Sequence, residues 1–196
     1  MSKSLNIALS IRRFFEDHLV SQRGLSPNTV LSYRDTLKLL LQFAVEHCRK
    51  SCTDLTMDDL TPNLVRQFLE HLSGIRKNSV RTRNARLAGI HAFFRYLSTT
   101  EPRLIAHCQS ILAVPFKRHA RPVLGYLEKE EVLHIFRYID VEKSLGRRDN
   151  ALLRLLYNTG ARVQEIVDLN VNHIRFSRPY CARIHGKGHR ERTCPL

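Results

Sequence analysis

Apolar residues between positions 7 and 98 recur three and four apart, which is the spacing of amphipathic helices. We expect four helices, over residues 7–21, from Ser26-Pro27 to about residue 44, from Thr61-Pro62 to about residue 72, and over about residues 79–98. Ser26 and Thr61 are each followed by proline, the signature of an N-cap and a first helical turn. Residues 51–61 are expected to form a polar connection. The pattern therefore predicts a compact four-helix bundle.

The pattern changes after residue 113. Residues 114–124 contain two prolines and four Lys, Arg or His residues without an acid, so they predict an extended basic linker. Helices are expected from about residue 127 and over residues 146–158. Strands are then expected over residues 174–176, 180–184 and 190–194, with a tight turn at Gly186-Lys187-Gly188. The fold class is mainly α with a small antiparallel β-sheet, divided into residues 1–113, the linker 114–124 and residues 125–196.

The segment 152–166 joins an apolar helix to a second, shorter one. Leu152, Leu155 and Leu156 fall on one face, and we expect that face to be buried. Gly160 permits a sharp turn, which places Arg162 in the first turn of the next helix, where anions are attracted. Taken alone, this segment fits an anion-binding arginine and an ordinary surface arginine about equally well.

Charge favours a polyanionic partner. The chain has 32 Lys and Arg against 18 acids, a formal charge of +14, and each half carries the same excess. Nucleic acid is the leading candidate and a membrane surface is the alternative. No stretch approaches the roughly 20 apolar residues of a spanning helix, and residues 1–10 do not form a secretory signal. We therefore expect a cytoplasmic protein without a membrane association.

The five cysteines are scattered at positions 48, 52, 108, 181 and 194. Cys48 and Cys52 follow His47, but no second close pair completes a metal site. Reduced thiols are the expected state, and neither a metal nor another cofactor is expected.

The strongest candidates for DNA-binding residues lie at the fourth predicted helix and in the linker. No acid lies between Glu70 and Glu101, so a solvated basic face there would repel itself. An acid-free helix start rich in arginine suits phosphate contact and base reading in a major groove. The candidate DNA-binding residues are Arg76, Lys77, Arg81, Arg83, Arg86, Lys117, Arg118 and Arg121.

Two motifs in the second half are more specific. The first is Thr159-Gly160-Ala161-Arg162, with Glu165, Ile166 and Leu169 following at helical spacing. The second is His185-Gly186-Lys187-Gly188, followed by residues 189–196 of sequence HRERTCPL. In this order and spacing they resemble the tyrosine recombinases, the family of phage integrases and Xer-type proteins. The basic helical bundle resembles that family's SAM-like core-binding domain.

The resemblance implies a C-shaped clamp around double-stranded DNA, with the bundle on one face and an α/β catalytic domain on the other. It implies that Arg162 holds the scissile phosphate and that Lys187 protonates the departing 5′ oxygen, with Glu165 in a supporting role. It also implies DNA integration and recombination as the activity and other recombinase protomers as partners. A transcription regulator with a basic bundle is disfavoured, because it would need neither motif.

The departures from the family pattern bear on activity. His173 stands where the family often has Asp. The family's His-x-x-Arg pair, a further His or Trp, and the tyrosine nucleophile would follow residue 196. The six tyrosines, at 33, 96, 126, 138, 157 and 180, all precede that region. We therefore expect a catalytic domain truncated within its second half, without a nucleophile and inactive alone. The alternative function is a non-catalytic DNA-binding remnant that occupies recombination sites.

Overall fold

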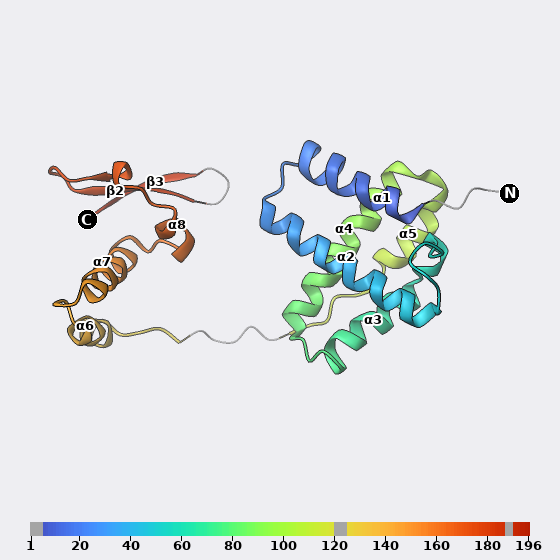
Figure 1. The fold of residues 1–196 in the computed structure, drawn as a ribbon, viewed down its shortest axis with the longest axis horizontal. Coiled ribbons are helices and arrows are strands. Elements are labelled where there is room, and N and C mark those ends of the chain that lie inside the picture. The colour runs from blue at the N-terminus through green and yellow to red at the C-terminus, as the bar shows by residue number, and fades with distance from the viewer. Residues whose placement is uncertain (1–5, 120–124, 187–189) are drawn as a thin grey trace. The chain divides into compact units, whose positions relative to one another are not determined.

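The computed structural model describes residues 6–119, 125–186 and 190–196. The chain divides into two compact units between Arg121 and Pro122 (Figure 1). We refer to them as the helical unit and the C-terminal unit. Arg121, a predicted DNA-binding residue, and Lys187, the predicted proton donor to the 5′ oxygen, lie outside the described residues.

Five α-helices build the helical unit. They are α1 (Ile7–Arg13), α2 (Pro27–Cys48), α3 (Pro62–Gly74), α4 (Val80–Thr100) and α5 (Ile105–Leu112), and α1 continues into a π-helical segment, Phe14–Gln22. Short 3-10 turns follow at Met57–Asp59 and Pro102–Leu104. The four predicted helices are confirmed. The fifth, α5, was not predicted.

Side-chain caps begin four of these helices, and on α1 the backbone N–H of Leu9 donates to Asn6 Oδ1 at 3.1 Å. The backbone N–H of Leu64 donates to Thr61 Oγ1 at 3.1 Å, and that of Thr82 donates to Ser79 Oγ at 3.2 Å. Ser26 accepts from the N–H of Thr29 in the same way. Each cap satisfies a backbone donor that has no partner within the helix. The predicted starts at Ser26-Pro27 and Thr61-Pro62 are thus confirmed.

One apolar core holds the helical unit together. The buried side chains of α3 are Leu64, Val65, Phe68, Leu69 and Leu72, and Phe14, Leu87, Ile90 and Phe94 are fully buried. The residue Gly89 lets α4 approach α2 closely, because a Cβ there would lie 3.2 Å from Thr36 Cγ2. A side chain at this position would therefore press on Thr36 where α4 and α2 are packed closely.

Two segments of the helical unit differ from the prediction. The connection 51–61 is not simply polar, because Leu55, Met57 and Leu60 are buried in the core. The start of the predicted linker also belongs to the core, since Val114 is only 3% exposed and α5 buries Cys108 and Ile111 beside it. Single apolar residues in short segments have no period to reveal them, which is why the sequence pattern missed them.

The C-terminal unit combines helices α6 (Lys129–Tyr138), α7 (Ser144–Thr159) and α8 (Val163–Val167) with a three-stranded sheet. Its strands are β1 (Ile174–Arg175), β2 (Cys181–His185) and β3 (Glu191–Pro195), antiparallel in the order β1-β2-β3. In the β2–β3 register Ile184 pairs with Arg192 and Ala182 with Cys194. The predicted small antiparallel sheet is confirmed.

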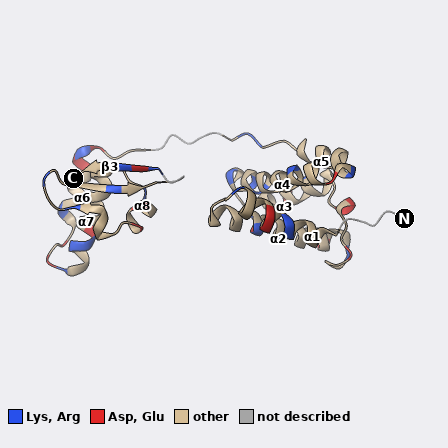
Figure 2. Ribbon diagram, turned by 90° about the horizontal axis from the view of Figure 1, so that it is seen from above, with Lys and Arg blue, Asp and Glu red and all other residues tan. Residues whose placement is uncertain are grey.

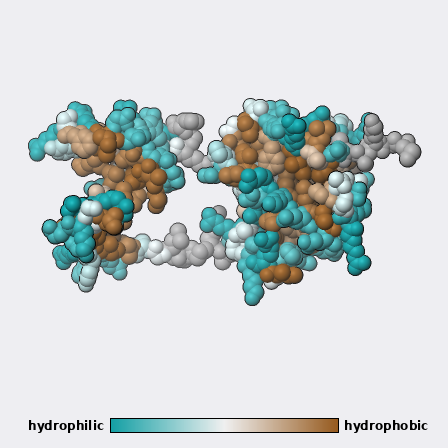
Figure 3. Space-filling view, in the orientation of Figure 1, coloured by the Kyte–Doolittle hydropathy of each residue, from teal (hydrophilic) through white to brown (hydrophobic). Residues whose placement is uncertain are grey.

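The core of the C-terminal unit is small. It consists of Ala182, Ile184 and Cys194, with Leu155 and Ala161 packed against them. The prediction that Leu152 would be buried is wrong, since it is 39% exposed. Hydrophobic side chains gather on the surface around α7 and α8 in Figure 3, because the described part of the unit offers α7 little to pack against. Within the described residues no helix is long and apolar enough to cross a membrane.

Candidate phosphate-binding site

A sharp turn links α7 to α8. Gly160 ends α7 with φ of +59°, a conformation that costs glycine least. The Thr159 hydroxyl donates to Leu155 O at 2.6 Å and accepts from the N–H of Ala161 at 3.3 Å. Arg162 follows as the N-cap of α8, one position before the first turn in which it was expected. The turn thus holds the Arg162 backbone at the junction of the two helices.

Glu165 is the centre of a charged network. Its side chain is 6% exposed, and it accepts hydrogen bonds from three donors. Glu165 Oε1 accepts from Arg162 Nη1 at 2.7 Å, and Oε2 accepts from the Arg162 backbone N–H at 3.0 Å. Oε2 also accepts from Arg192 Nη2 on β3 at 2.8 Å. The hydrogen bond to Glu165 holds one edge of the Arg162 guanidinium. The rest of the side chain faces solvent, since it is 73% exposed.

These hydrogen bonds set the charge of the site. Donation by Arg192, then by the Arg162 backbone and side chain, lowers the pKa of Glu165 to about 2. Hydrogen bonding to Glu165 in turn raises the pKa of Arg192. The carboxylate therefore stays ionised near neutral pH, and the three groups carry a net positive charge.

Gly186, which directly follows β2, lies close to this network. Gly186 N–H donates to Arg190 O at 2.7 Å. A Cβ on Gly186 would lie 3.3 Å from Glu165 Oε1 and 3.3 Å from Arg190 O, so a larger residue would crowd the carboxylate. Lys187 itself lies outside the described residues, but its neighbour in sequence is adjacent to Glu165.

Histidines lie at the base of the same turn. His185 Nδ1 is 2.9 Å from Glu191 Oε1, and the rings of His173 and His185 are 4.8 Å apart between centroids. His173, which departs from the family pattern, thus lies beside the hairpin that carries Lys187. All five cysteines are free thiols, and among the described residues no group of three or more potential ligands is placed to hold a metal ion.

The predicted DNA-binding residues of the helical unit fall into two groups. Arg76, Lys77, Arg81, Lys117 and Arg118 are exposed. Arg83 is half-buried, and its Nη1 donates to Asn84 Oδ1 at 3.1 Å. Arg86 Nη1 donates to Ser32 O at 3.2 Å and to Thr36 Oγ1 at 3.1 Å, so it fastens α4 to α2. Figure 2 shows basic residues on both units.

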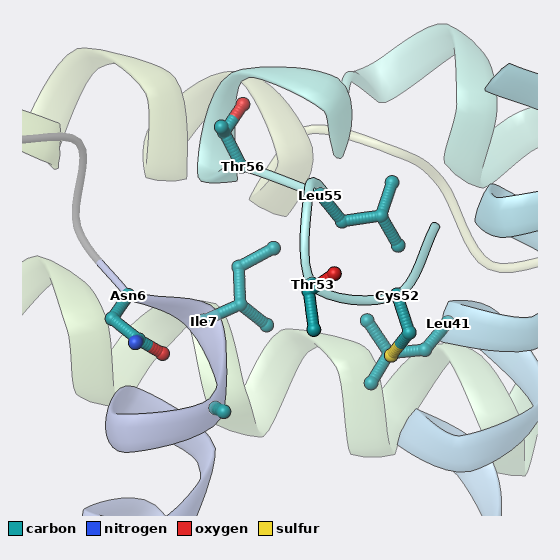
Figure 4. A pocket seen from close by; sticks show the side chains of 8 residues that line it. Asn6, Ile7, Leu41, Cys52, Thr53, Leu55 and Thr56 are labelled. Carbon is teal, nitrogen blue, oxygen red and sulfur yellow. The ribbon is translucent and has the colours of Figure 1, made fainter. Parts of the chain in front are cut away.

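A separate cavity of about 410 Å³ lies in the helical unit, between the start of α1, α2 and the segment after α2 (Figure 4). Its lining includes Ile7, Leu41, Cys52 and Leu55 but no charged side chain. An anion would find no compensating charge there. The network around Glu165 and the basic surface of α4 are therefore the better phosphate candidates.

Sequence reasoning missed Arg192. The alternation of side chains along a strand could have revealed it. Arg192 lies on the same face of β3 as the buried Cys194, so it points toward α8. The sequence placed Arg162 and Glu165 together, but not the second arginine that completes the network.

Two family models match the chain. Residues 11–101 match the N-terminal SAM-like domain of phage integrase, and residues 125–196 match the phage integrase family. Two proteins of Sinorhizobium fredii, the putative integrase/recombinases y4rC and y4rD, are 37% and 36% identical over this whole chain. The tyrosine recombinase XerD of Pseudomonas putida is 31% identical over 93% of it.

The relatives are longer. The chain spans 59% of y4rC, 70% of y4rD and 57% of XerD. Among solved structures, a λ integrase dimer bound to a COC′ core site matches with a TM-score of 0.66 at 15% identity, over 98% of this chain and 49% of that one. At that identity the match concerns the fold.

Proposed function

The chain belongs to the phage integrase family of tyrosine recombinases, and on that premise we propose that it binds double-stranded DNA and holds a backbone phosphate on Arg162. The observation that carries this proposal is the network around Glu165. It fixes one edge of the Arg162 guanidinium, while 73% of the side chain faces solvent. A guanidinium held in this way presents a preformed fork to phosphate oxygens.

Charge and family support duplex DNA as the ligand. The formal charge of +14 attracts a polyanion to both units. The exposed arginines and lysines of α4 and of the segment after α5 suit phosphate contacts, which position a protein on DNA without reading its sequence. We propose site-specific DNA recombination as the process, with other recombinase protomers as partners.

The proposed chemistry assigns a role to each residue of the site. Arg162 stabilises the negative charge that develops on the phosphate oxygens in the transition state, without reorganising. Glu165 holds Arg162 in place. We propose Lys187, which is flanked in sequence by Gly186 and Gly188, as the general acid for the departing 5′ oxygen.

Strand cleavage also needs a nucleophile, and we propose that these 196 residues alone do not supply it. Tyr33 and Tyr96 pack around the ring of Phe14 in the helical unit. In the described part of the chain no tyrosine hydroxyl hydrogen-bonds to Arg162 or Glu165. The alternative function is a DNA-binding protein that occupies recombination sites without cutting. It is supported by the same lack of a tyrosine bound to Arg162 or Glu165 in the described residues.

Duplex binding is expected to fall steeply as salt rises. A protein that neutralises several phosphates releases their counterions, and a loss of about a thousandfold between ~50 and ~200 mM salt corresponds to roughly six contacts. Fluorescence anisotropy with a labelled duplex measures this slope. Arg162→Ala should retain most of the affinity, because the helical unit supplies many of the contacts. Affinity that does not change with salt would contradict the proposal.

A suicide duplex nicked beside the cleavage site tests the missing nucleophile. Once a strand is cut, the short fragment diffuses away and any covalent protein–DNA adduct accumulates. We expect no adduct on a denaturing gel from the 196 residues. XerD of Pseudomonas putida on its own nicked site serves as the positive control for the method. An adduct would identify one of the six tyrosines as the nucleophile and would contradict the proposed division of labour.

A further inference from the structure

The segment after α5 is fastened to α4 by two hydrogen bonds. Asn84 Nδ2 donates to Lys117 O at 2.8 Å, and the Lys117 backbone N–H donates to Asn84 Oδ1 at 3.1 Å. One side chain therefore satisfies both backbone groups of a residue 33 positions away. We call residues 114–117 the strap, and this pair of hydrogen bonds the Asn84 clamp.

Two apolar contacts anchor the same strap. Val114 is 3% exposed in the core of the helical unit. The Phe116 ring lies edge-on to the ring of His91, with 5.2 Å between centroids, and His91 is itself buried on α4. Val114 therefore fixes the start of the strap in the core, and residues 116 and 117 hold its end against α4.

The clamp also gathers positive charge. Asn84 Oδ1 accepts from the guanidinium of Arg83 at 3.1 Å as well as from the Lys117 N–H, so Arg83 and the Lys117 backbone share one acceptor atom. Lys117 and Arg118 are exposed, and α4 contains no acid. Cations held together without a carboxylate repel one another, and an anion placed between them removes that cost.

We propose that Asn84 is a positioning residue that holds the strap on α4, so that Lys117 and Arg83 contact the phosphate backbone of the same DNA duplex. This inference rests on the proposed duplex binding. It adds the uncharged Asn84 to the residues on which DNA binding depends. Asn84 acts through the position of Lys117 and need not touch DNA. Arg86, by contrast, donates hydrogen bonds to Ser32 and Thr36 of α2.

A double-mutant cycle tests the proposal in the full chain. Lys117→Ala should lower the slope of log affinity against log salt by about one, the contribution of one phosphate contact. Asn84→Ala should lower it by a similar amount, although it removes no charge. In the Asn84→Ala background, Lys117→Ala should then have little further effect, because the lysine is already displaced. Lys38→Ala, at an exposed lysine of α2 outside the strap, is the matched control for charge.

Hydrogen exchange gives a second readout in the absence of DNA. The Lys117 amide should be protected in the wild-type chain and should lose that protection in Asn84→Ala. Asn84→Asp keeps the acceptor and loses the donor, so the Lys117 amide should be better protected in it than in Asn84→Ala. This second variant keeps the test valid if Asn84→Ala impairs folding. Additive effects of the two substitutions, or an unchanged salt slope in Asn84→Ala, would overturn the inference alone. Failure of the wild-type chain to bind duplex would overturn the proposed function, and this inference with it.

Discussion

Replacing Phe14 with alanine is expected to destabilise the helical unit by about 3–5 kcal/mol, the usual cost of removing a buried aromatic ring. The ring is completely buried. Its centroid lies 5.3 Å from those of Phe15 and Phe93, and 5.5 Å from that of Tyr96. The substitution removes the apolar contacts of the ring and leaves a cavity that its rigid aromatic neighbours cannot easily fill.

Urea unfolding followed by circular dichroism at 222 nm (a helix signal) measures this loss, since most of the helical residues lie in the helical unit. Val20→Ala is the matched control. Val20 belongs to the same π-helical segment but is 54% exposed, so its substitution should change the free energy of unfolding by no more than about 0.5 kcal/mol. Equal effects of the two substitutions would show that Phe14 is not central to the core.

The helical unit could be predicted largely from the sequence because its signals are local and repeated. Leu64, Val65, Phe68, Leu69 and Leu72 recur with helical spacing, and all are buried. Ser–Pro and Thr–Pro pairs mark the starts of α2 and α3. The short helix α5 offered no comparable run, and its burial of Cys108 and Ile111 depends on contacts that only the folded unit provides.

The candidate site could be predicted only in part, for a related reason. Arg162 and Glu165 are three residues apart, so helical geometry alone brings them together. Arg192 is 27 residues from Glu165, and its position depends on the β2–β3 register, in which a slip of one residue would turn its side chain to the other face. Arg86 shows the converse case. The sequence makes it a candidate for DNA binding, whereas its hydrogen bonds to Ser32 and Thr36 depend on how α4 packs on α2.

The C-terminal unit is expected to lose stability as pH falls from about 4.5 to about 2, and Glu165→Gln should remove much of this dependence. Hydrogen bonds from Arg192 and Arg162 lower the pKa of Glu165 from 4.5 to about 2. A carboxyl group whose pKa is lower in the folded state stabilises the fold above its unfolded pKa, and this contribution disappears as pH falls through the folded pKa. Glutamine cannot titrate, and one of its terminal atoms is a donor that faces an arginine.

Residue-resolved NMR during urea unfolding measures the effect on the C-terminal unit separately. The amide of Gly186, which donates to Arg190 O beside Glu165, reports on this region. Wild-type stability of β2 and β3 should drop as pH falls from about 4.5 to about 2, whereas the Glu165→Gln variant should be less stable than wild type at about pH 5 and should depend much less on pH below it. Glu130→Gln, at an exposed carboxyl of α6, should follow the wild-type curve. If Glu165→Gln also followed the wild-type curve, the carboxylate would not be the link between Arg162 and Arg192. Another group would then have to hold the Arg162 guanidinium in the proposed phosphate site.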